Sequence, residues 1–171
     1  MGESTPRPGD VLRLALGLAA IILALDQASK WVILSQVMAP PRVVEITGFF
    51  NLVLTYNTGV SFGLFGGAGA AWKPWVLGGL AVVVSAGLLY WLARQPERLL
   101  GLAVGFVVGG ALGNALDRAH QPGVVDFLDF HLAGWHWPAF NVADSSIFLG
   151  VVILVFDGLF RGRDRSNNEV N

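Results

Sequence analysis

The sequence contains no cysteine, which excludes disulfide bonds, thiol nucleophiles and metal sites with thiolate ligands. Charged residues are scarce as well, at 13% of the 171 residues. A formal net charge of −1 provides no basic field, so we expect no nucleic-acid partner. The three histidines, His120, His131 and His136, are too scattered to predict a metal site.

Hydrophobic residues make up 54% of the chain, and its mean hydropathy is +0.60. This excess is typical of a polytopic membrane protein, and the length suits one domain covering residues 1–171. No small-x-small cleavage site follows Leu25, so we expect the first apolar run to be an uncleaved spanning helix. Four transmembrane helices are predicted, at about 11–33, 75–93, 99–116 and 141–160.

The distribution of basic residues predicts the orientation of these helices. Arginines precede the first helix, join the second to the third at Arg94 and Arg98, and follow the fourth. The positive-inside rule therefore predicts cytoplasmic termini and two outward loops, about 34–74 and 119–139. Five of the six tryptophans fall near the outer boundary of the predicted spans: Trp31, Trp72, Trp75, Trp135 and Trp137.

The two outward loops differ in composition. Residues 42–58 are rich in β-branched and aromatic residues, broken by Gly48, which predicts two short strands of a small sheet. Residues 63–69 are glycine-rich, and we expect a mobile loop able to cover a site at the membrane surface. For residues 124–131 we expect an irregular outer segment without regular secondary structure. The predicted fold is an all-α membrane protein of four transmembrane helices with a small extracytoplasmic β-sheet and a periplasmic loop or helix.

The third predicted helix carries a glycine at every fourth position: Gly101, Gly105, Gly109 and Gly113. On a helix these glycines form one smooth stripe that lets another backbone approach closely. We expect the stripe to serve helix packing and to press the polar end of this helix against a neighbour.

Polar residues gather at the outer ends of the helices. Asn114, Asp117 and Arg118 share one face of the third helix, either as a neutralised helix end or as a group that contacts substrate. Asp26 and Lys30 are spaced for an ion pair on the first helix, although Asp26 could also shape a site.

Two further carboxylates, Asp126 and Asp144, are candidates for acid/base chemistry, because an ionisable group near a bilayer is by default a functional-site hypothesis. Each also has a structural explanation. Asn141 could cap the fourth helix with Asp144 in its first turn, and Asp126 and Asp129 could be solvated. A proton-coupled transporter and a structural scaffold are the alternatives. The transporter alternative predicts acids at the bilayer midplane. The scaffold alternative leaves the polar cluster at the outer ends of the helices unexplained.

Five blocks of sequence resemble the bacterial lipoprotein signal peptidases (signal peptidase II), and they occur in the order of that family. They are DQASK at 26–30, NTGVSF at 57–62, GGALGNALDR at 109–118, VVDF at 124–127 and FNVAD at 140–144. The resemblance implies an aspartyl endopeptidase of the bacterial cytoplasmic (inner) membrane. Such an enzyme removes signal peptides from prolipoproteins by cutting before a cysteine that carries a diacylglyceryl group.

The resemblance also implies roles for individual residues. The catalytic pair falls on Asp126 and Asp144, with the active site near the outer face, and no metal or other cofactor is needed. Positions that surround the pair or contact substrate fall on Asp26, Lys30, Asn57, Gly59, Asn114, Asp117, Arg118 and Asn141. Asn57 would help to hold substrate or the inhibitor globomycin. Val60 and Ser61 replace two alanines usual in the family, which bears on substrate preference. The implied partners are the prolipoprotein and membrane lipid, and the implied state is a monomer.

Overall fold

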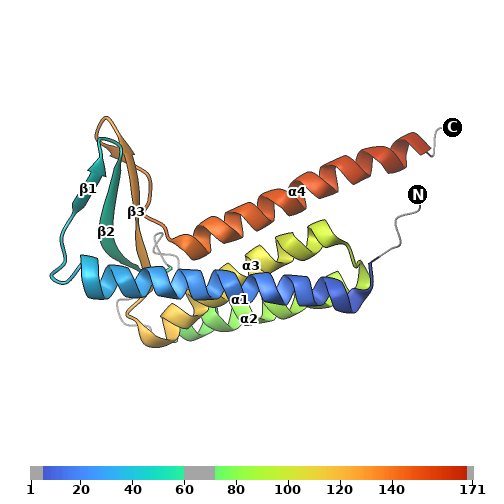
Figure 1. Cartoon of the computed structure of the whole chain (residues 1–171), viewed down its shortest axis with the longest axis horizontal. Coiled ribbons are helices and arrows are strands. Elements are labelled where there is room, and N and C mark those ends of the chain that lie inside the picture. The colour runs from blue at the N-terminus through green and yellow to red at the C-terminus, as the bar shows by residue number, and fades with distance from the viewer. Residues whose placement is uncertain (1–5, 60–71, 169–171) are drawn as a thin grey trace.

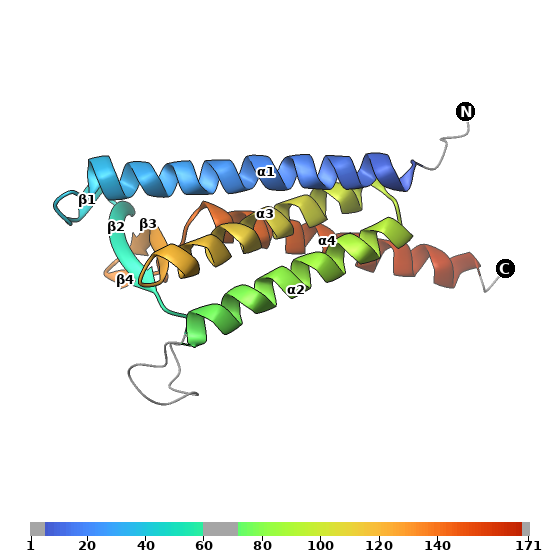
Figure 2. The same ribbon diagram turned by 90° about the horizontal axis from the view of Figure 1, so that it is seen from below.

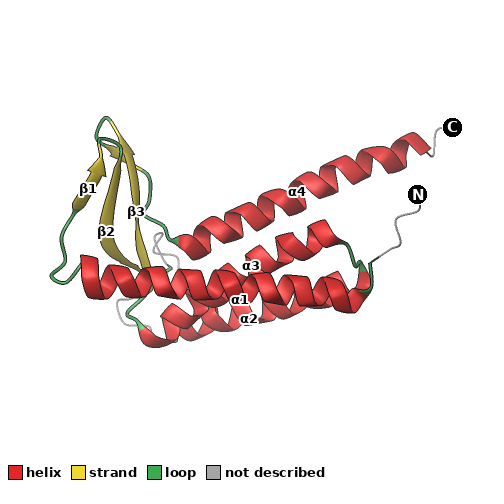
Figure 3. Cartoon of the chain, in the orientation of Figure 1, coloured by secondary structure: helices red, strands yellow, loops and turns green. Residues whose placement is uncertain are grey.

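The computed structural model describes residues 6–59 and 72–168, and the side chains of these as far as Phe160. The glycine-rich loop predicted at 63–69, with Val60 and Ser61, lies outside the described residues. The helices are α1 (Pro8–Val32), α2 (Lys73–Arg94), α3 (Arg98–His120) and α4 (Val142–Asn168), and a π-helical turn, Ile33–Val37, extends α1. Figure 1 and Figure 3 show them with the small sheet at one end.

The described residues contain four helices that are long and apolar enough to cross a membrane, as predicted. The helix ends extend beyond the predictions. α3 continues past Asp117 and Arg118 to His120, because these polar groups find partners within the protein. α4 continues past the predicted span, which ended near Phe160, to Asn168.

α3 is the central helix of the bundle. It packs on α1, α2 and α4, and it is by far the most buried of the four (Figure 2). Its glycine stripe faces α1, which confirms the predicted role in close packing. A Cβ added to Gly105 would lie 2.8 Å from the Ala15 carbonyl oxygen, and one on Gly109 would lie 2.7 Å from the Ile22 Cβ. Only glycine allows the two backbones to approach this closely.

The sheet has four antiparallel strands in the order β1-β2-β3-β4. β1 (Val44–Thr47) and β2 (Phe50–Asn57) are the two strands predicted within residues 42–58. β3 (Val124–Leu132) pairs with β2 along most of its length, and β4 (Trp135–His136) adds a short edge. The expectation of an irregular segment at 124–131 is therefore wrong. Most of β3 is buried on both faces, so it lacks the alternation that marks a half-exposed strand.

The sheet lies across one end of the helix bundle, and the two chain termini lie at the opposite end (Figure 1, Figure 2). An apolar cluster of Ile33, Met38 and Phe127 joins the π-helical turn of α1 to β3. The C-terminal ends of α1 and α3 and the start of α4 therefore meet the sheet where the polar residues are concentrated.

Candidate active site

The first turn of α4 is closed by a reciprocal pair of hydrogen bonds between Asn141 and Asp144. The Asn141 Oδ1 accepts from the backbone N–H of Asp144 at 2.9 Å, and the Asp144 Oδ2 accepts from the backbone N–H of Asn141 at 3.2 Å. This is the geometry of a capping box, and it satisfies amide donors that a helix start leaves free. The predicted N-cap is confirmed, and it fixes the position of the Asp144 carboxylate.

The same asparagine holds Asp126. The Asn141 Nδ2 donates to the Asp126 Oδ1 at 2.7 Å and lies 3.2 Å from the Val125 carbonyl oxygen. Asn141 is fully buried and Asp126 is almost so. One residue, through its side chain and its backbone N–H, therefore brings together two carboxylates that the sequence analysis singled out, one from β3 and one from α4.

Asn114 of α3 completes the link from the other side. Its Nδ2 donates to the Asp144 Oδ1 at 2.7 Å, and its Oδ1 lies 3.2 Å from the Asn141 Nδ2. The Lys30 Nζ lies 3.3 Å from the same oxygen. Both oxygens of Asp144 thus accept hydrogen bonds, which leaves its carboxylate little freedom to rotate.

Lys30 is a buried ammonium group between two carboxylates. Its Nζ lies 2.8 Å from the Asp26 Oδ2 and 2.7 Å from the Asp117 Oδ2. The Asp117 Oδ2 also accepts from the backbone N–H of Val125 at 3.0 Å, directly before Asp126. The pair predicted on α1 is therefore more than local, because it connects α1 and α3 to the strand that carries Asp126.

Asp26 reaches the start of α4 as well. Its Oδ1 accepts from the backbone N–H of Ala143 at 2.9 Å. A Cβ added to Gly113 would lie 2.6 Å from the Asp26 Oδ2, so the last glycine of the stripe makes room for this carboxylate. The negative charge at a helix N-terminus is favourable.

Gln27 belongs to this network, although the sequence analysis predicts no role for it. Its Nε2 lies 3.1 Å from the Asp26 Oδ2, 2.9 Å from the Asp117 Oδ1 and 3.3 Å from the Gly113 carbonyl oxygen. The sequence does carry a signal for this role, because Gln27 is a polar residue next to Asp26 within a predicted membrane-spanning helix.

The environment of Asp126 makes its carboxyl hard to ionise. Burial raises the pKa of Asp126 to about 6, and the negative charge of Asp144 acts in the same direction. Hydrogen bonds from Asn57 and Asn141 oppose the shift without cancelling it. A neighbouring pair in which one carboxyl retains its proton near neutral pH is the arrangement used for acid/base chemistry by two aspartates.

Arg118 and Gly59 border the pair. The Arg118 Nη1 donates to the Asn114 carbonyl oxygen at 3.1 Å, whereas its buried Nε has no hydrogen-bond partner among the described residues. Gly59 has a positive φ of 77°, and a Cβ there would lie 2.6 Å from the Leu77 Cδ1. The Asn57 side chain accepts from the Gly59 N–H at 2.9 Å, which fixes the turn after β2.

Asp129 lies apart from this cluster and is not solvated, contrary to expectation. Its side chain is buried between the Asn51 Nδ2 at 3.1 Å and the His136 Nδ1 at 2.9 Å. Burial acts to raise the pKa of Asp129, but the hydrogen bonds from His136 and Asn51 outweigh it and hold that pKa below its ordinary value. Asp126 and Asp129 therefore differ in protonation as well as in position.

Comparison with known proteins shows the family of this chain. A family model described as signal peptidase (SPase) II matches residues 18–160. A lipoprotein signal peptidase of Ralstonia nicotianae is 47% identical over 149 residues, covering 86% of this chain and 85% of the relative. One from Paraburkholderia phytofirmans is 44% identical over 149 residues, covering 86% of each chain.

A solved structure described as a bacterial membrane enzyme superposes with a TM-score of 0.72 at 27% identity, covering 90% of each chain. A second, with the same description, has a TM-score of 0.73 at 27% identity and covers 85% of this chain and 92% of its own. The family model and these relatives show that this chain belongs to the signal peptidase II family of peptidases.

Proposed function

We propose that this peptidase removes the signal peptide from diacylglyceryl-modified prolipoproteins, cutting before the lipidated cysteine with Asp126 and Asp144 as its catalytic pair. The observation that carries the proposal is Asn141, which hydrogen-bonds both carboxylates from one buried position. The family match and the relatives named lipoprotein signal peptidase support the substrate class.

In this proposal the two carboxyls divide the acid and base roles. Asp126, with its raised pKa, holds the proton, and ionised Asp144 accepts a proton from the attacking water. The water oxygen adds to the scissile carbonyl carbon while Asp126 protonates the carbonyl oxygen. The C–N bond then breaks as Asp144 returns the proton to nitrogen and Asp126 takes a proton back from a hydroxyl of the intermediate, which yields a carboxylic acid and an amine and restores both carboxyls. The titration belongs to the pair rather than to either residue.

The surrounding residues hold this pair and the substrate. Asn114, Asn141, Asp26, Lys30 and Asp117 form the hydrogen-bonded frame that fixes the carboxylates. Arg118 is suited to hold a substrate carbonyl, because its buried Nε is an unused donor. Asn57 and Gly59 would hold the extended segment of substrate beside β2.

The location follows from the substrate. The acyl chains of a lipidated cysteine remain in the bilayer, so its scissile bond lies near the interface. We place the pair at the outer face of the bacterial inner membrane, with both termini in the cytoplasm, in accord with the positive-inside rule. In this proposal residues 1–171 act as one monomeric membrane domain, without a cofactor and surrounded by membrane lipid.

The decisive experiment compares Asp126→Asn and Asp144→Asn with the unaltered protein in lipid vesicles, using a diacylglyceryl prolipoprotein as substrate. Each variant is expected to lose at least about a hundredfold in cleavage rate, because a proton acceptor or donor is removed. Asp10→Asn is the matched control, since Asp10 is an exposed aspartate near the start of α1, at the end of the helix away from the carboxylate pair. Robust cleavage by either of the first two variants would refute the catalytic pair.

The same assay distinguishes the substrate class. An unlipidated precursor is expected to be cleaved poorly by the unaltered protein, because it lacks the acyl chains that hold the cysteine at the interface. Globomycin serves as the inhibitor control. Equal turnover of lipidated and unlipidated precursors would leave the pair intact but contradict the proposed specificity.

A further inference from the structure

An aromatic groove of about 490 Å³ lies at the tip of the sheet, away from the carboxylate pair. Its lining is hydrophobic except for the imidazole of His131. The lining residues are Phe49, Phe130, His131, Leu132, Trp135, Trp137 and Phe140. We call this surface the aromatic tip. Leu132 is 74% exposed and Trp135 is 61% exposed. A contiguous apolar surface of this kind marks an interaction site.

The aromatic tip is continuous with the membrane-spanning surface of α4. Phe140 belongs to its lining and precedes α4 by two residues. Phe140 also forms a bridge with Leu128 of β3, and its ring stacks on that of Phe130 at 5.9 Å. Phe148 and Val151, further along α4, expose apolar side chains. An apolar surface therefore runs from the sheet on to a helix that faces lipid.

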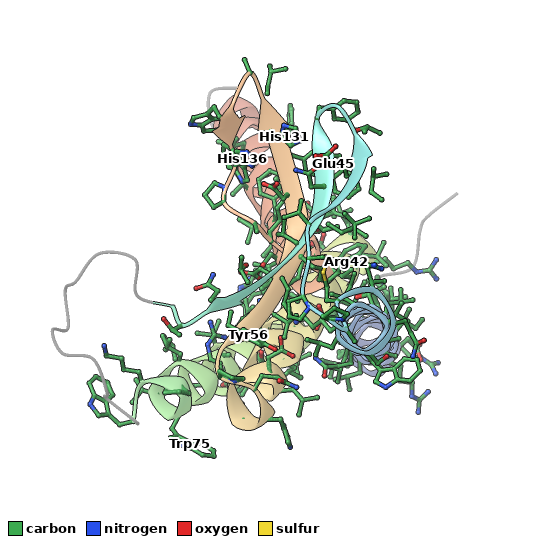
Figure 4. All side chains as sticks on the ribbon, turned by 90° about the vertical axis from the view of Figure 1, so that its left-hand side faces the viewer. Arg42, Glu45, Tyr56, Trp75, His131 and His136 are labelled. Carbon is green, nitrogen blue, oxygen red and sulfur yellow. The ribbon has the colours of Figure 1, made fainter. Side chains whose placement is uncertain are left out.

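The arrangement of the elements places the aromatic tip beside the bundle rather than on its axis. The sheet lies across the helix ends and extends toward the side to which α4 inclines (Figure 1). Viewed from the sheet end, His131 and His136 lie far from Trp75 at the start of α2, and α4 passes behind the tip (Figure 4). In a membrane, the tip would overhang lipid next to α4.

The charges around the aromatic tip also suit a lipid neighbour. The sequence contains no lysine or arginine between Arg118 and Arg161. The carboxylate of the hairpin, Asp129, is buried and paired with His136. The two tryptophans combine a large apolar ring with one N–H donor, which suits the boundary between headgroups and acyl chains.

We propose that the aromatic tip is a docking surface for the phospholipid leaflet at this end of the helices, with Leu132, Trp135 and Trp137 entering the boundary between headgroups and acyl chains. This contact fixes the height of β3, and of the Asp126 that it carries, relative to the bilayer. The proposal concerns the surface alone and does not depend on the chemistry of the carboxylate pair.

The absence of cysteine allows a direct test, because Leu132→Cys provides a single site for a thiol-reactive fluorophore. The labelled full-length protein is placed in phosphatidylethanolamine–phosphatidylglycerol vesicles, with and without bromine on the acyl chains close to the headgroup. Emission should be at least about twofold lower with brominated lipid, as expected for a site about 5–10 Å into the boundary. Glu45→Cys is the matched control, because Glu45 is exposed on β1, and its label should change little.

Equal emission from the Leu132→Cys label in both kinds of vesicle would overturn the proposal. A blue-shifted emission that bromine does not quench would also overturn it, because protein, such as a second copy of the chain, would then cover the tip. Helical circular dichroism verifies the fold of each variant. If Leu132→Cys does not fold, Trp135→Cys, at the neighbouring exposed position, provides the same measurement with the same two outcomes.

Discussion

Asn141 shows how one amide side chain can define a two-carboxylate site. Its Oδ1 caps α4, its Nδ2 holds Asp126, and its backbone N–H holds Asp144. An aspartate of similar shape would keep the cap but bring a third negative charge to the pair. An alanine would lose the cap, at a cost of about 1 kcal/mol, together with the side-chain hydrogen bond that holds Asp126.

The raised pKa of Asp126 makes the stability of the protein depend on pH. A carboxyl whose pKa is higher in the folded than in the unfolded chain is protonated more readily when folded, so its ionised form opposes folding. That penalty is absent below about pH 4, the unfolded value, and is complete above the folded pKa of about 6.

Asp126→Asn should therefore raise the melting temperature at pH 8 and have less effect at pH 4.5. The expected gain at pH 8 is about 3 kcal/mol, because the pKa is raised by about two units, each unit corresponds to about 1.4 kcal/mol, and the amide keeps an acceptor for Asn141. Thermal unfolding in detergent over this pH range provides the measurement. A melting temperature that falls equally at both pH values would contradict a pKa raised by burial.

Among the elements, α3 depends on small residues on two faces. The stripe of Gly101, Gly105, Gly109 and Gly113 receives α1, and Gly110 meets the Ala143 carbonyl oxygen of α4. Because the close contacts at Gly105, Gly109 and Gly110 include backbone carbonyl oxygens, the neighbouring helices cannot yield there by changing a rotamer. The polar ends of α1, α3 and α4 meet at Asn114 only if α3 keeps both close contacts, the one with α1 and the one with α4.

Gly109→Ala should destabilise the protein by about 1–3 kcal/mol, the usual cost of overpacking a close contact. Its new Cβ would lie 2.8 Å from the Ala19 carbonyl oxygen and 2.7 Å from the Ile22 Cβ. Gly79→Ala on α2 is the control, because a Cβ there meets nothing within 4 Å. The control should be neutral or stabilising by up to about 1 kcal/mol. Equal melting temperatures for the two variants would argue against the close α1–α3 contact.

In the sheet, Asp129 ties three strands together through Asn51 of β2 and His136 of β4. Its lowered pKa means that its ionised form stabilises the fold. This stabilisation is complete above the unfolded value of about 4 and is lost as the pH falls through the lower, folded value.

Asp129→Asn should lower the free energy of unfolding at pH 7 by about 1.5–3 kcal/mol, the range of a hydrogen bond to a charged group. The difference from the unaltered protein should shrink as the pH falls below about 4, where the carboxylate takes up a proton. Melting curves of the two proteins across this range test the prediction. A difference that does not vary with pH would mean that Asp129 contributes through shape rather than charge.

For the whole molecule, long apolar runs were enough to predict the four helices, and the glycine stripe predicted the close packing of α3. The sequence did not reveal β3, because a strand buried on both faces lacks alternation. Nor did it reveal the cross-links of Lys30 to Asp117 and of Asp26 to Ala143, since these join helices distant in sequence. Those partners depend on how the helices pack, which local spacing does not determine.

The proposed orientation predicts which thiols a membrane-impermeant reagent can reach in cells whose inner membrane is intact. Glu45→Cys lies in the sheet and should be labelled, whereas Gln95→Cys lies in the turn between α2 and α3 and should be protected. Permeabilising the cells should make both react, which controls for access. Labelling of Gln95→Cys without permeabilisation would place the sheet and the carboxylate pair in the cytoplasm.

The link from Asp26 on α1 to Ala143 on α4 has a consequence for biosynthesis. A ribosome delivers α1, α2, α3 and β3 to the membrane before α4, and Asp144 arrives only with that last helix. A partly made chain therefore carries Asp126 without Asp144. In the proposed mechanism, the cleaving centre forms only once the first turn of α4 has packed against α3, where Asn114 holds Asp144.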